Sequence, residues 1–141
     1  MNKFFIRRWI IKGFRKNRKV EDTVCTAVDS RITVALYDWV QENGFCRQCR
    51  MEEAAEELGT SKEQLSWYFN RTKTGGFVKW RTNLRIMYAM EILDKHPHLP
   101  FSAVGEFVGI PDKSNFRKEF RHIVGMSPQE WRRSRLEKLG H

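Results

Sequence analysis

Residues 51–69 read MEEAAEELGTSKEQLSWYF, and this stretch predicts the fold of the chain. A small residue, Ala55, is followed four positions later by Gly59, and the bulky apolar Leu65 comes six positions after the glycine. Two helices that meet at a tight corner need a small side chain where they cross and a glycine where the backbone turns. Ser61 then opens the second segment with a capping-box pattern. The stretch therefore predicts a helix-turn-helix.

The same pattern recurs in the second half of the chain. Ala55 and Gly59 recur as Gly105 and Gly109, both 50 positions further on. Four more residues recur 51 positions on: Leu65, Phe69, Trp80 and Arg81 correspond to Phe116, Phe120, Trp131 and Arg132. A match spread along some thirty positions indicates an internal repeat of one structural unit. Two helix-turn-helix units in tandem are the prediction.

Apolar residues recur at helical spacing in segment after segment, and strand patterns are nearly absent. An apolar stripe over residues 31–42 predicts a helix that ends at Asn43-Gly44. The longest element is predicted over 77–95, because Pro97 and Pro100 stop it. The predicted fold is all-α, with two helix-turn-helix units bridged by a long linker helix. The predicted parts are a basic N-terminal segment over 1–30, amphipathic or disordered, a first unit over 31–76, the linker helix over 77–96 and a second unit over 97–141.

Over about residues 31–135 the sequence resembles the DNA-binding domain of the AraC/XylS family of bacterial transcription regulators. The carrying residues are 51–69, the linker pieces Leu84-Arg85, Ala89 and Ile92-Leu93, and a second set from Val104 through Gly109, Asp112, Ser114, Phe116 and Phe120 to Gly125-Met-Ser-Pro-Gln-Glu-Trp-Arg132. The resemblance implies seven helices and two units bridged by the long helix. It also implies activation of transcription through contact with RNA polymerase.

The sequence departs from the family pattern at two positions of the second unit. Gly105 stands where the family usually has alanine, and Ile110 stands where it usually has phenylalanine after the turn glycine. Both are expected to loosen the second unit while keeping the fold. The ligand-sensing domain that most members carry upstream is not recognised in the sequence. Either the protein is a stand-alone member controlled by its abundance, or it is the tail of a larger protein.

The residues expected to contact DNA in the first unit are those left when the buried side of its second helix is set aside. With Leu65 and Phe69 inward, the outward positions are Lys62, Glu63, Ser66, Trp67, Asn70 and Arg71. Trp67 has two readings, contact with thymine methyls or sugar, and cover for the adjacent linker helix. Glu63 is either an acceptor from cytosine N4 or a neutral bystander.

The second unit has the more basic recognition helix. With Phe116 and Phe120 inward, the outward positions are Lys113, Ser114, Arg117, Lys118 and Arg121. Arginine or lysine paired with guanine is the commonest specific contact to DNA. Lys113, Arg117 and Lys118 are therefore the main candidates for base or backbone contact, and a solvated basic face is the alternative. Arg81 and Arg132 are expected to contact the phosphate backbone or to pair with acidic residues of the preceding unit.

The charge of the chain is unevenly distributed. It has 26 Lys and Arg against 17 Asp and Glu, which favours an anionic partner. Eight of these bases and no acid lie in residues 1–20, so the remainder is nearly neutral. On a helix, this segment would gather apolar residues on one side and basic residues on the other. It fits contact with DNA phosphates, contact with an anionic membrane surface, the cytoplasmic flank of a membrane span, or a disordered tail.

Other readings of the sequence have less support. No stretch approaches the ~18 apolar residues of a membrane-spanning helix. Three cysteines without a secretory signal indicate reduced thiols and a cytoplasmic location. Cys46 and Cys49 have the spacing of zinc ligands, but a second pair, His96 and His98, would lie ~28 Å away across the linker helix, so no metal or other cofactor is predicted.

The function classes can be ranked from the same observations. No spacing of acids, histidines or serines assembles a catalytic site, so an enzyme is not expected. A peripheral membrane or partner-binding protein, with the helix-turn-helix units as scaffold, is the second reading. We predict a sequence-specific regulator of transcription that binds duplex DNA, an activator in the AraC/XylS manner.

Overall fold

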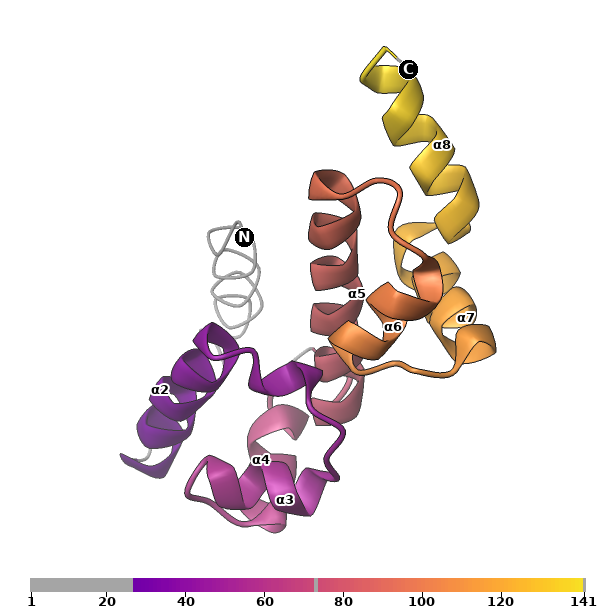
Figure 1. The fold of residues 1–141 in the computed structure, drawn as a ribbon. Coiled ribbons are helices and arrows are strands. Elements are labelled where there is room, and N and C mark those ends of the chain that lie inside the picture. The colour runs from indigo at the N-terminus through magenta and orange to yellow at the C-terminus, as the bar shows by residue number, and fades with distance from the viewer. Residues whose placement is uncertain (1–26, 73, 141) are drawn as a thin grey trace. The chain divides into compact units, whose positions relative to one another are not determined.

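The computed structural model describes residues 27–72 and 74–140, and it confirms the all-α prediction over this part of the chain (Figure 1). The elements are α2 (Ala27–Gln41), the short 3-10 helix η2 (Gly44–Cys46), α3 (Met51–Glu57), α4 (Lys62–Asn70), α5 (Phe77–Lys95), α6 (Phe101–Val108), α7 (Lys113–Val124) and α8 (Pro128–Lys138). The predictions for the basic segment at residues 1–20 lie outside the described residues.

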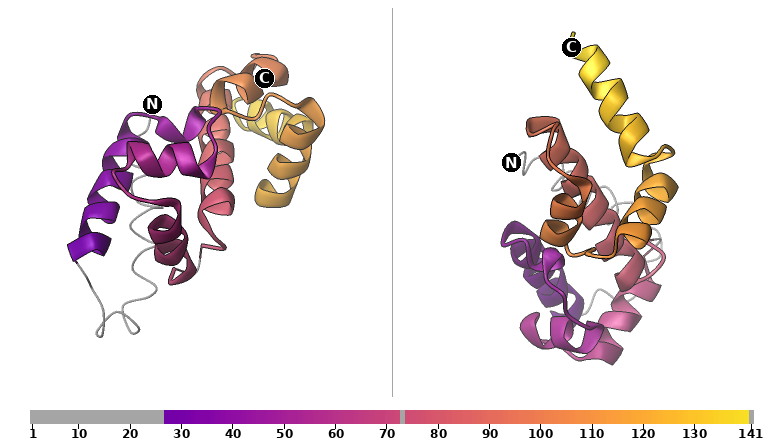
Figure 2. Two further views of the ribbon diagram at one scale, coloured as in Figure 1. Left: turned by 90° about the horizontal axis from the view of Figure 1, so that it is seen from below. Right: turned by 45° about the vertical axis from the view of Figure 1, so that its right-hand side comes forward.

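The described residues form two compact units that divide within α5, between Arg81 and Thr82. The N-terminal unit, residues 27–81, contains α2, η2, α3, α4 and the start of α5. The C-terminal unit, residues 82–140, contains the rest of α5 with α6, α7 and α8 (Figure 2). Each unit thus has its own helix-turn-helix, formed by α3 and α4 in one and by α6 and α7 in the other.

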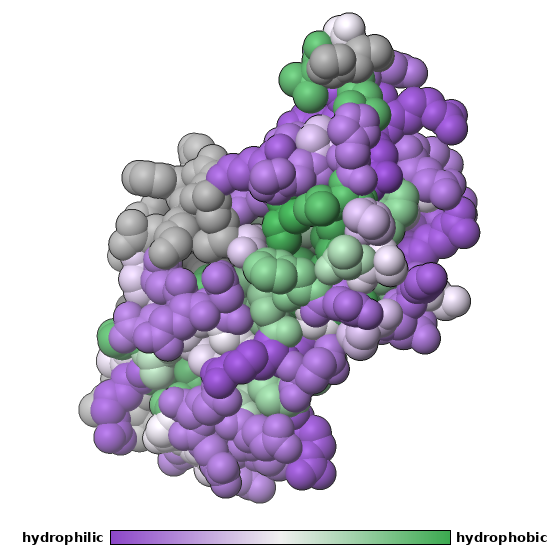
Figure 3. Space-filling model, viewed as in Figure 1, coloured by the Kyte–Doolittle hydropathy of each residue, from purple (hydrophilic) through white to green (hydrophobic). Residues whose placement is uncertain are grey.

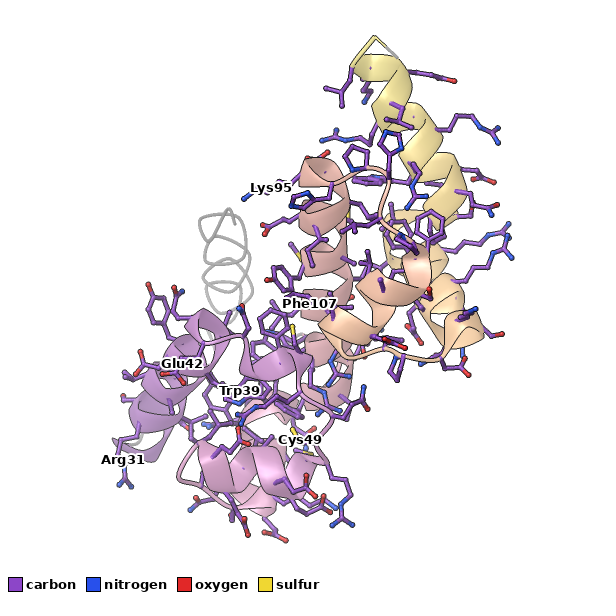
Figure 4. The ribbon with its side chains drawn as sticks, viewed as in Figure 1. Arg31, Trp39, Glu42, Cys49, Lys95 and Phe107 are labelled. Atoms are coloured by element: carbon purple, nitrogen blue, oxygen red, sulfur yellow. The ribbon has the colours of Figure 1, made fainter. Side chains whose placement is uncertain are left out.

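Aromatic side chains form the core of the N-terminal unit. The Trp80 ring lies 5.1 Å from Phe69 and is stacked 6.4 Å from Trp39, measured between ring centroids. Trp39 turns inward from α2, and its indole nitrogen donates to a Glu57 carboxylate oxygen 3.0 Å away (Figure 4). Aromatic pairs of this kind add to the hydrophobic burial that holds helices together. The core fixes α2 and α5 against α4.

Helix α2 is described from Ala27 and thus includes the four residues before the apolar stripe of residues 31–42. The Thr33 hydroxyl donates to the Asp29 carbonyl 2.9 Å away, and the buried Asp29 carboxylate pairs with Arg71 at the end of α4. This ion pair ties the first turns of α2 to α4. The spacing of apolar residues along the helix could not predict this contact, because its partner lies 42 residues away in the sequence.

The corner between α3 and α4 has the predicted geometry. Gly59 has a φ of 73°, and the Thr60 N–H donates to the Ala55 carbonyl 2.9 Å away. Ser61 accepts from the Gln64 N–H, as an N-cap residue does. The reciprocal bond of a capping box is absent here, because the Gln64 side-chain oxygen accepts from the Thr60 hydroxyl instead. The serine therefore caps α4 alone.

The corner of the C-terminal unit is tighter. Gly109 has a φ of 95°, and the Ile110 N–H donates to the Gly105 carbonyl 2.7 Å away. A Cβ atom on Gly105 would lie 2.6 Å from the Ile110 carbonyl oxygen. The expectation that Gly105 and Ile110 loosen this unit stays a prediction, although the packing at the corner is close. Glycine permits the close approach of the turn, and Ile110 is buried.

The repeat extends to two arginines whose role the sequence interpretation missed. Arg81 is buried and donates to the Cys49 carbonyl, 2.7 Å away, in the loop before α3. Arg132 donates to the Leu99 carbonyl in the loop before α6, and its guanidinium lies 3.8 Å from the centre of the Phe101 ring. Neither pairs with an acid among the residues that the structure describes. Each arginine fixes the loop that leads into its own helix-turn-helix.

Replacing Gly105 by alanine is expected to lower the free energy of unfolding by about 1–3 kcal/mol, the usual cost of overpacking a closely packed site. The added Cβ has to displace backbone rather than a flexible side chain. Chemical denaturation measures the change. Glu106→Ala, at the exposed next position of α6, is the matched control and is expected to change stability by less than about 0.5 kcal/mol. Equal stability of the two variants would contradict the close approach.

Candidate nucleic-acid interface

Helix α7 presents the five predicted residues to solvent. Its N-cap residue Asp112 accepts from the Asn115 N–H 2.7 Å away, and Phe116 and Phe120 are buried on its inner side. The five outward residues, all exposed, are Lys113, Ser114, Arg117, Lys118 and Arg121. They fall at helical spacing on one side of the helix. The predicted recognition surface of the C-terminal unit is thus brought together on α7.

No acidic side chain neutralises this surface within the described residues. The five ion pairs found there all lie elsewhere, and none includes a basic residue of α7. Glu119, the one acidic residue of the helix, is itself half-buried. Lysine and arginine side chains without acidic partners are available to phosphate oxygens and to guanine. This surface is the stronger half of the candidate interface.

A surface hollow of about 360 Å³ adjoins α7 in the same unit. Lys113, Ser114 and Arg117 line one side of it, and Ser102 and Gln129 line it from the starts of α6 and α8. Sequence reasoning missed the last two residues. Their sequence positions could not predict this neighbourhood, because only the folded unit brings the starts of α6 and α8 beside α7.

Helix α4 also exposes its predicted residues, to different degrees. Lys62, Glu63, Trp67 and Asn70 are exposed, whereas Ser66 and Arg71 are half-buried. The inner side carries Leu65 and Phe69 as predicted, and it also carries Tyr68, whose hydroxyl lies 2.7 Å from the Thr33 hydroxyl. The candidate contacts of α4 thus face solvent for the most part.

Two basic residues at the ends of α4, its first residue Lys62 and its C-cap residue Arg71, already have protein partners. The Lys62 ammonium lies 2.9 Å from a Glu52 carboxylate oxygen on α3. Their hydrogen bond raises the pKa of Lys62 and lowers the pKa of Glu52, so both remain charged near neutral pH. Arg71 is paired with Asp29, and its guanidinium lies 3.9 Å from the centre of the Trp67 ring.

These pairs change the surface expected for the first helix-turn-helix. The Trp67 side chain is 50% exposed and stacks on Arg71, an arrangement that neither sequence reading anticipated. Helix α3 also carries four glutamates, at 52, 53, 56 and 57. The N-terminal unit therefore presents a mixed-charge surface, in contrast to the basic surface of α7.

The alternative metal site has no support among the described residues. No group of three or more potential ligands is found there, and Cys46 and Cys49 are not joined in a disulfide. Cys49 lies in the loop before α3, with its sulfur 3.9 Å from the Arg81 guanidinium (Figure 4). None of the helices described is long and apolar enough to cross a membrane.

Comparison with known proteins identifies the family that has this architecture. A family described as a helix-turn-helix domain matches residues 54–134, more than half of the 141 residues. The chain belongs to this helix-turn-helix family. The match includes both corners and the linker helix α5, so it covers the two units rather than one. The predicted AraC/XylS-type DNA-binding domain is confirmed.

Two regulators and one solved structure are similar to the helix-turn-helix chain. The HTH-type transcriptional regulator YpdC of Escherichia coli is 29% identical over 97 residues, which are 69% of this chain and 33% of that protein. The arabinose operon regulatory protein of Escherichia coli is 25% identical over 128 residues, 89% of this chain and 42% of that protein.

The C-terminal domain of AraT, a response regulator from Geobacillus stearothermophilus, has a TM-score of 0.61 and 26% identity, and the match covers 77% of this chain and 86% of that one. The chain spans about a third to two fifths of the two Escherichia coli regulators. The family match indicates a DNA-binding domain rather than a catalytic one.

Proposed function

We propose that this chain is a transcription regulator that binds duplex DNA sequence-specifically, in the AraC/XylS manner, and that it activates transcription by contacting RNA polymerase. The single observation that supports it most is the basic outer side of α7, which follows a helix-turn-helix corner and makes no ion pair with an acid in the described part of the chain. The names of the similar regulators support the role in transcription. A partner that is chromosomal DNA implies the bacterial cytoplasm as the place of action.

The roles of the α7 residues follow from their positions. Lys113, Arg117 and Lys118 read bases or hold the adjacent backbone, and Ser114 adds a hydrogen-bonding hydroxyl. Arg121, one turn beyond Arg117, contacts phosphate where the helix leaves the groove. The α4 contacts are Lys62, Glu63, Ser66, Trp67, Asn70 and Arg71, with Arg71 holding Trp67 in place through the stacking contact.

A binding titration at two salt concentrations tests the proposal. A duplex selected from a random library and a random duplex of equal length are compared by gel shift. The selected duplex is expected to bind at least about a thousandfold more tightly, and the logarithm of the association constant is expected to fall by about 0.9 for each phosphate neutralised per tenfold increase in salt. Equal affinity for both duplexes, or affinity independent of salt, would exclude sequence-specific DNA binding.

The activator role needs its own measurement. Run-off transcription with purified RNA polymerase is expected to give more transcript when the selected site lies upstream of the promoter and the protein is added. A variant that keeps its DNA affinity but loses this increase would locate the polymerase contact. A fall in transcript on addition of the protein would contradict activation and indicate a repressor.

Glu52→Gln is expected to raise DNA affinity roughly two- to fivefold at low salt, the size of effect that a surface ion pair produces. The substitution frees the Lys62 ammonium for phosphate and removes a negative charge beside α4. Glu56→Gln removes the same charge from α3 without releasing a lysine and is the matched control. Gel shift at 50 mM and at a higher salt concentration measures both. An equal gain in the two variants would show that Lys62 takes no part in the interface.

A further inference from the structure

The C-terminal unit contains a second cavity, of about 410 Å³, away from the outer side of α7. Its lining comes from α5, from the loop after α5 and from α6, and it includes Tyr88, Glu91, Ile92, Val104 and Phe107. No residue of α7 lines it. Small-molecule sites in proteins have volumes of roughly 300–1,000 Å³ and mostly apolar walls with a few polar groups. The size and lining of this cavity match that description.

Apolar side chains are exposed at the cavity. Phe107 is 61% exposed, and its ring lies 5.8 Å from the ring of Tyr88, which is buried. Figure 3 shows apolar surface gathered over α5 and α6 of this unit. Large exposed apolar side chains that cluster beside a cavity are typical of a binding surface. In Figure 4, Phe107 lies on α6, and Lys95 lies at the end of α5.

Glu91 is the unusual residue of this cavity. Both of its carboxylate oxygens are buried, and neither accepts a hydrogen bond from any residue that the structure describes. Burial raises the pKa of Glu91, and the charge of Lys95, one turn further along α5, opposes this shift only in part. The other titratable groups in the lining are Lys95, His96 and the Tyr88 hydroxyl. A buried carboxylate without a donor is costly, and a cation with N–H groups removes that cost.

We propose that this cavity binds a small organic cation with an apolar body, whose ammonium group donates to the Glu91 carboxylate and whose body packs against Ile92, Val104 and Phe107. The two aromatic rings, Tyr88 and Phe107, also attract positive charge through their faces. Lys95 also lines the cavity, but it is exposed and its charge is screened by solvent, whereas an anionic ligand would lie against the buried Glu91 carboxylate. The cavity is therefore selective for the charge of the ligand as well as for its apolar body.

The test compares two probes of nearly equal shape on the full chain. 4-Phenylbutylammonium carries the positive charge, and 4-phenylbutanol replaces it with a neutral hydroxyl group. Calorimetric titration at pH 7 is expected to show that the ammonium binds about tenfold more tightly than the alcohol, the difference expected of a charge-assisted hydrogen bond. In Glu91→Gln the ammonium is expected to lose this advantage, while the alcohol binds as before. Neither measurement involves DNA.

A matched variant and a pH series sharpen the test. Glu106→Gln removes an exposed acid of α6 that does not line the cavity, and it is expected to leave both affinities unchanged. Lowering the pH is expected to abolish the preference for ammonium in the unmutated chain, because protonation removes the charge of Glu91. The loss begins at a higher pH than for an ordinary glutamate, in the direction of the raised pKa.

Three results would overturn the proposal. The first is equal affinity for ammonium and alcohol, and the second is an ammonium preference that survives in Glu91→Gln. The third is the absence of binding by either probe. Amide NMR shifts caused by the ammonium should also map to Tyr88, Glu91 and Phe107. Shifts confined to α7 would place the ligand elsewhere and would count against the cavity.

Discussion

Replacing Arg117 by alanine is expected to weaken binding to the preferred duplex by about 1–3 kcal/mol and to flatten base preference at one position, as the loss of a bidentate contact to guanine does. Arg117 is exposed in the middle of α7, directly after the buried Phe116 that anchors the helix. It makes no ion pair within the described part of the chain, so its removal leaves no buried charge behind. Selection from a random library with the variant measures the change in preference.

Arg121→Ala is the matched comparison for this prediction. Arg121 lies one turn further along α7, and its loss is expected to weaken all sequences alike and to lower the salt slope by about one. Circular dichroism of both variants checks that α7 remains folded. If Arg117→Ala keeps its base preference, Arg117 is removed from base readout, and Lys113 and Lys118 become the residues that carry it.

Replacing Trp80 by alanine is expected to lower the free energy of unfolding of the N-terminal unit by about 3–5 kcal/mol, the range seen when a buried tryptophan is truncated. Trp80 is 1% exposed and contacts the rings of Phe69, Phe77 and Trp39. The cavity left by the indole cannot close, because helices from three parts of the unit surround it. The loss is therefore expected to be close to the full cost of the removed contacts.

Trp67→Ala is the control, because it removes the same side chain from a half-exposed position on α4. Its loss is expected to cost about 1 kcal/mol or less, through the stacking contact with Arg71. Urea denaturation followed by circular dichroism compares the two variants. A similar loss of stability in both would contradict the assignment of Trp80 to the centre of this core.

The two corners and their spacing were predictable from sequence because their causes are local. A glycine with positive φ, a serine at an N-cap position and a proline after a helix each act within a few residues. Gly59 and Gly109 have the left-handed conformation, and Ser127 and Glu130 form the complete capping box. The outer side of α7 followed by elimination, once Phe116 and Phe120 were assigned to the core.

The partners of the charged residues depended on the tertiary structure. Sequence shows that Arg71 and Lys62 are basic, but only the fold places Asp29 beside the first and Glu52 beside the second. In the same way, Arg81 and Arg132 were interpreted as contacts for phosphates or acids, and the fold directs both to backbone carbonyls. A long arginine side chain can reach many acceptors, and sequence spacing does not show which acceptor it will bind.

The sequence by itself thus determined the helices, the tandem corners and the basic side of α7, because short-range backbone preferences and hydrophobic period decide these features. The tertiary structure alone decided that Lys62 and Arg71 are paired with acids, and that Gly105 permits the close approach at its corner. It also decided that the Glu91 carboxylate is buried without a donor. Each of these depends on distances between residues that only packing brings together.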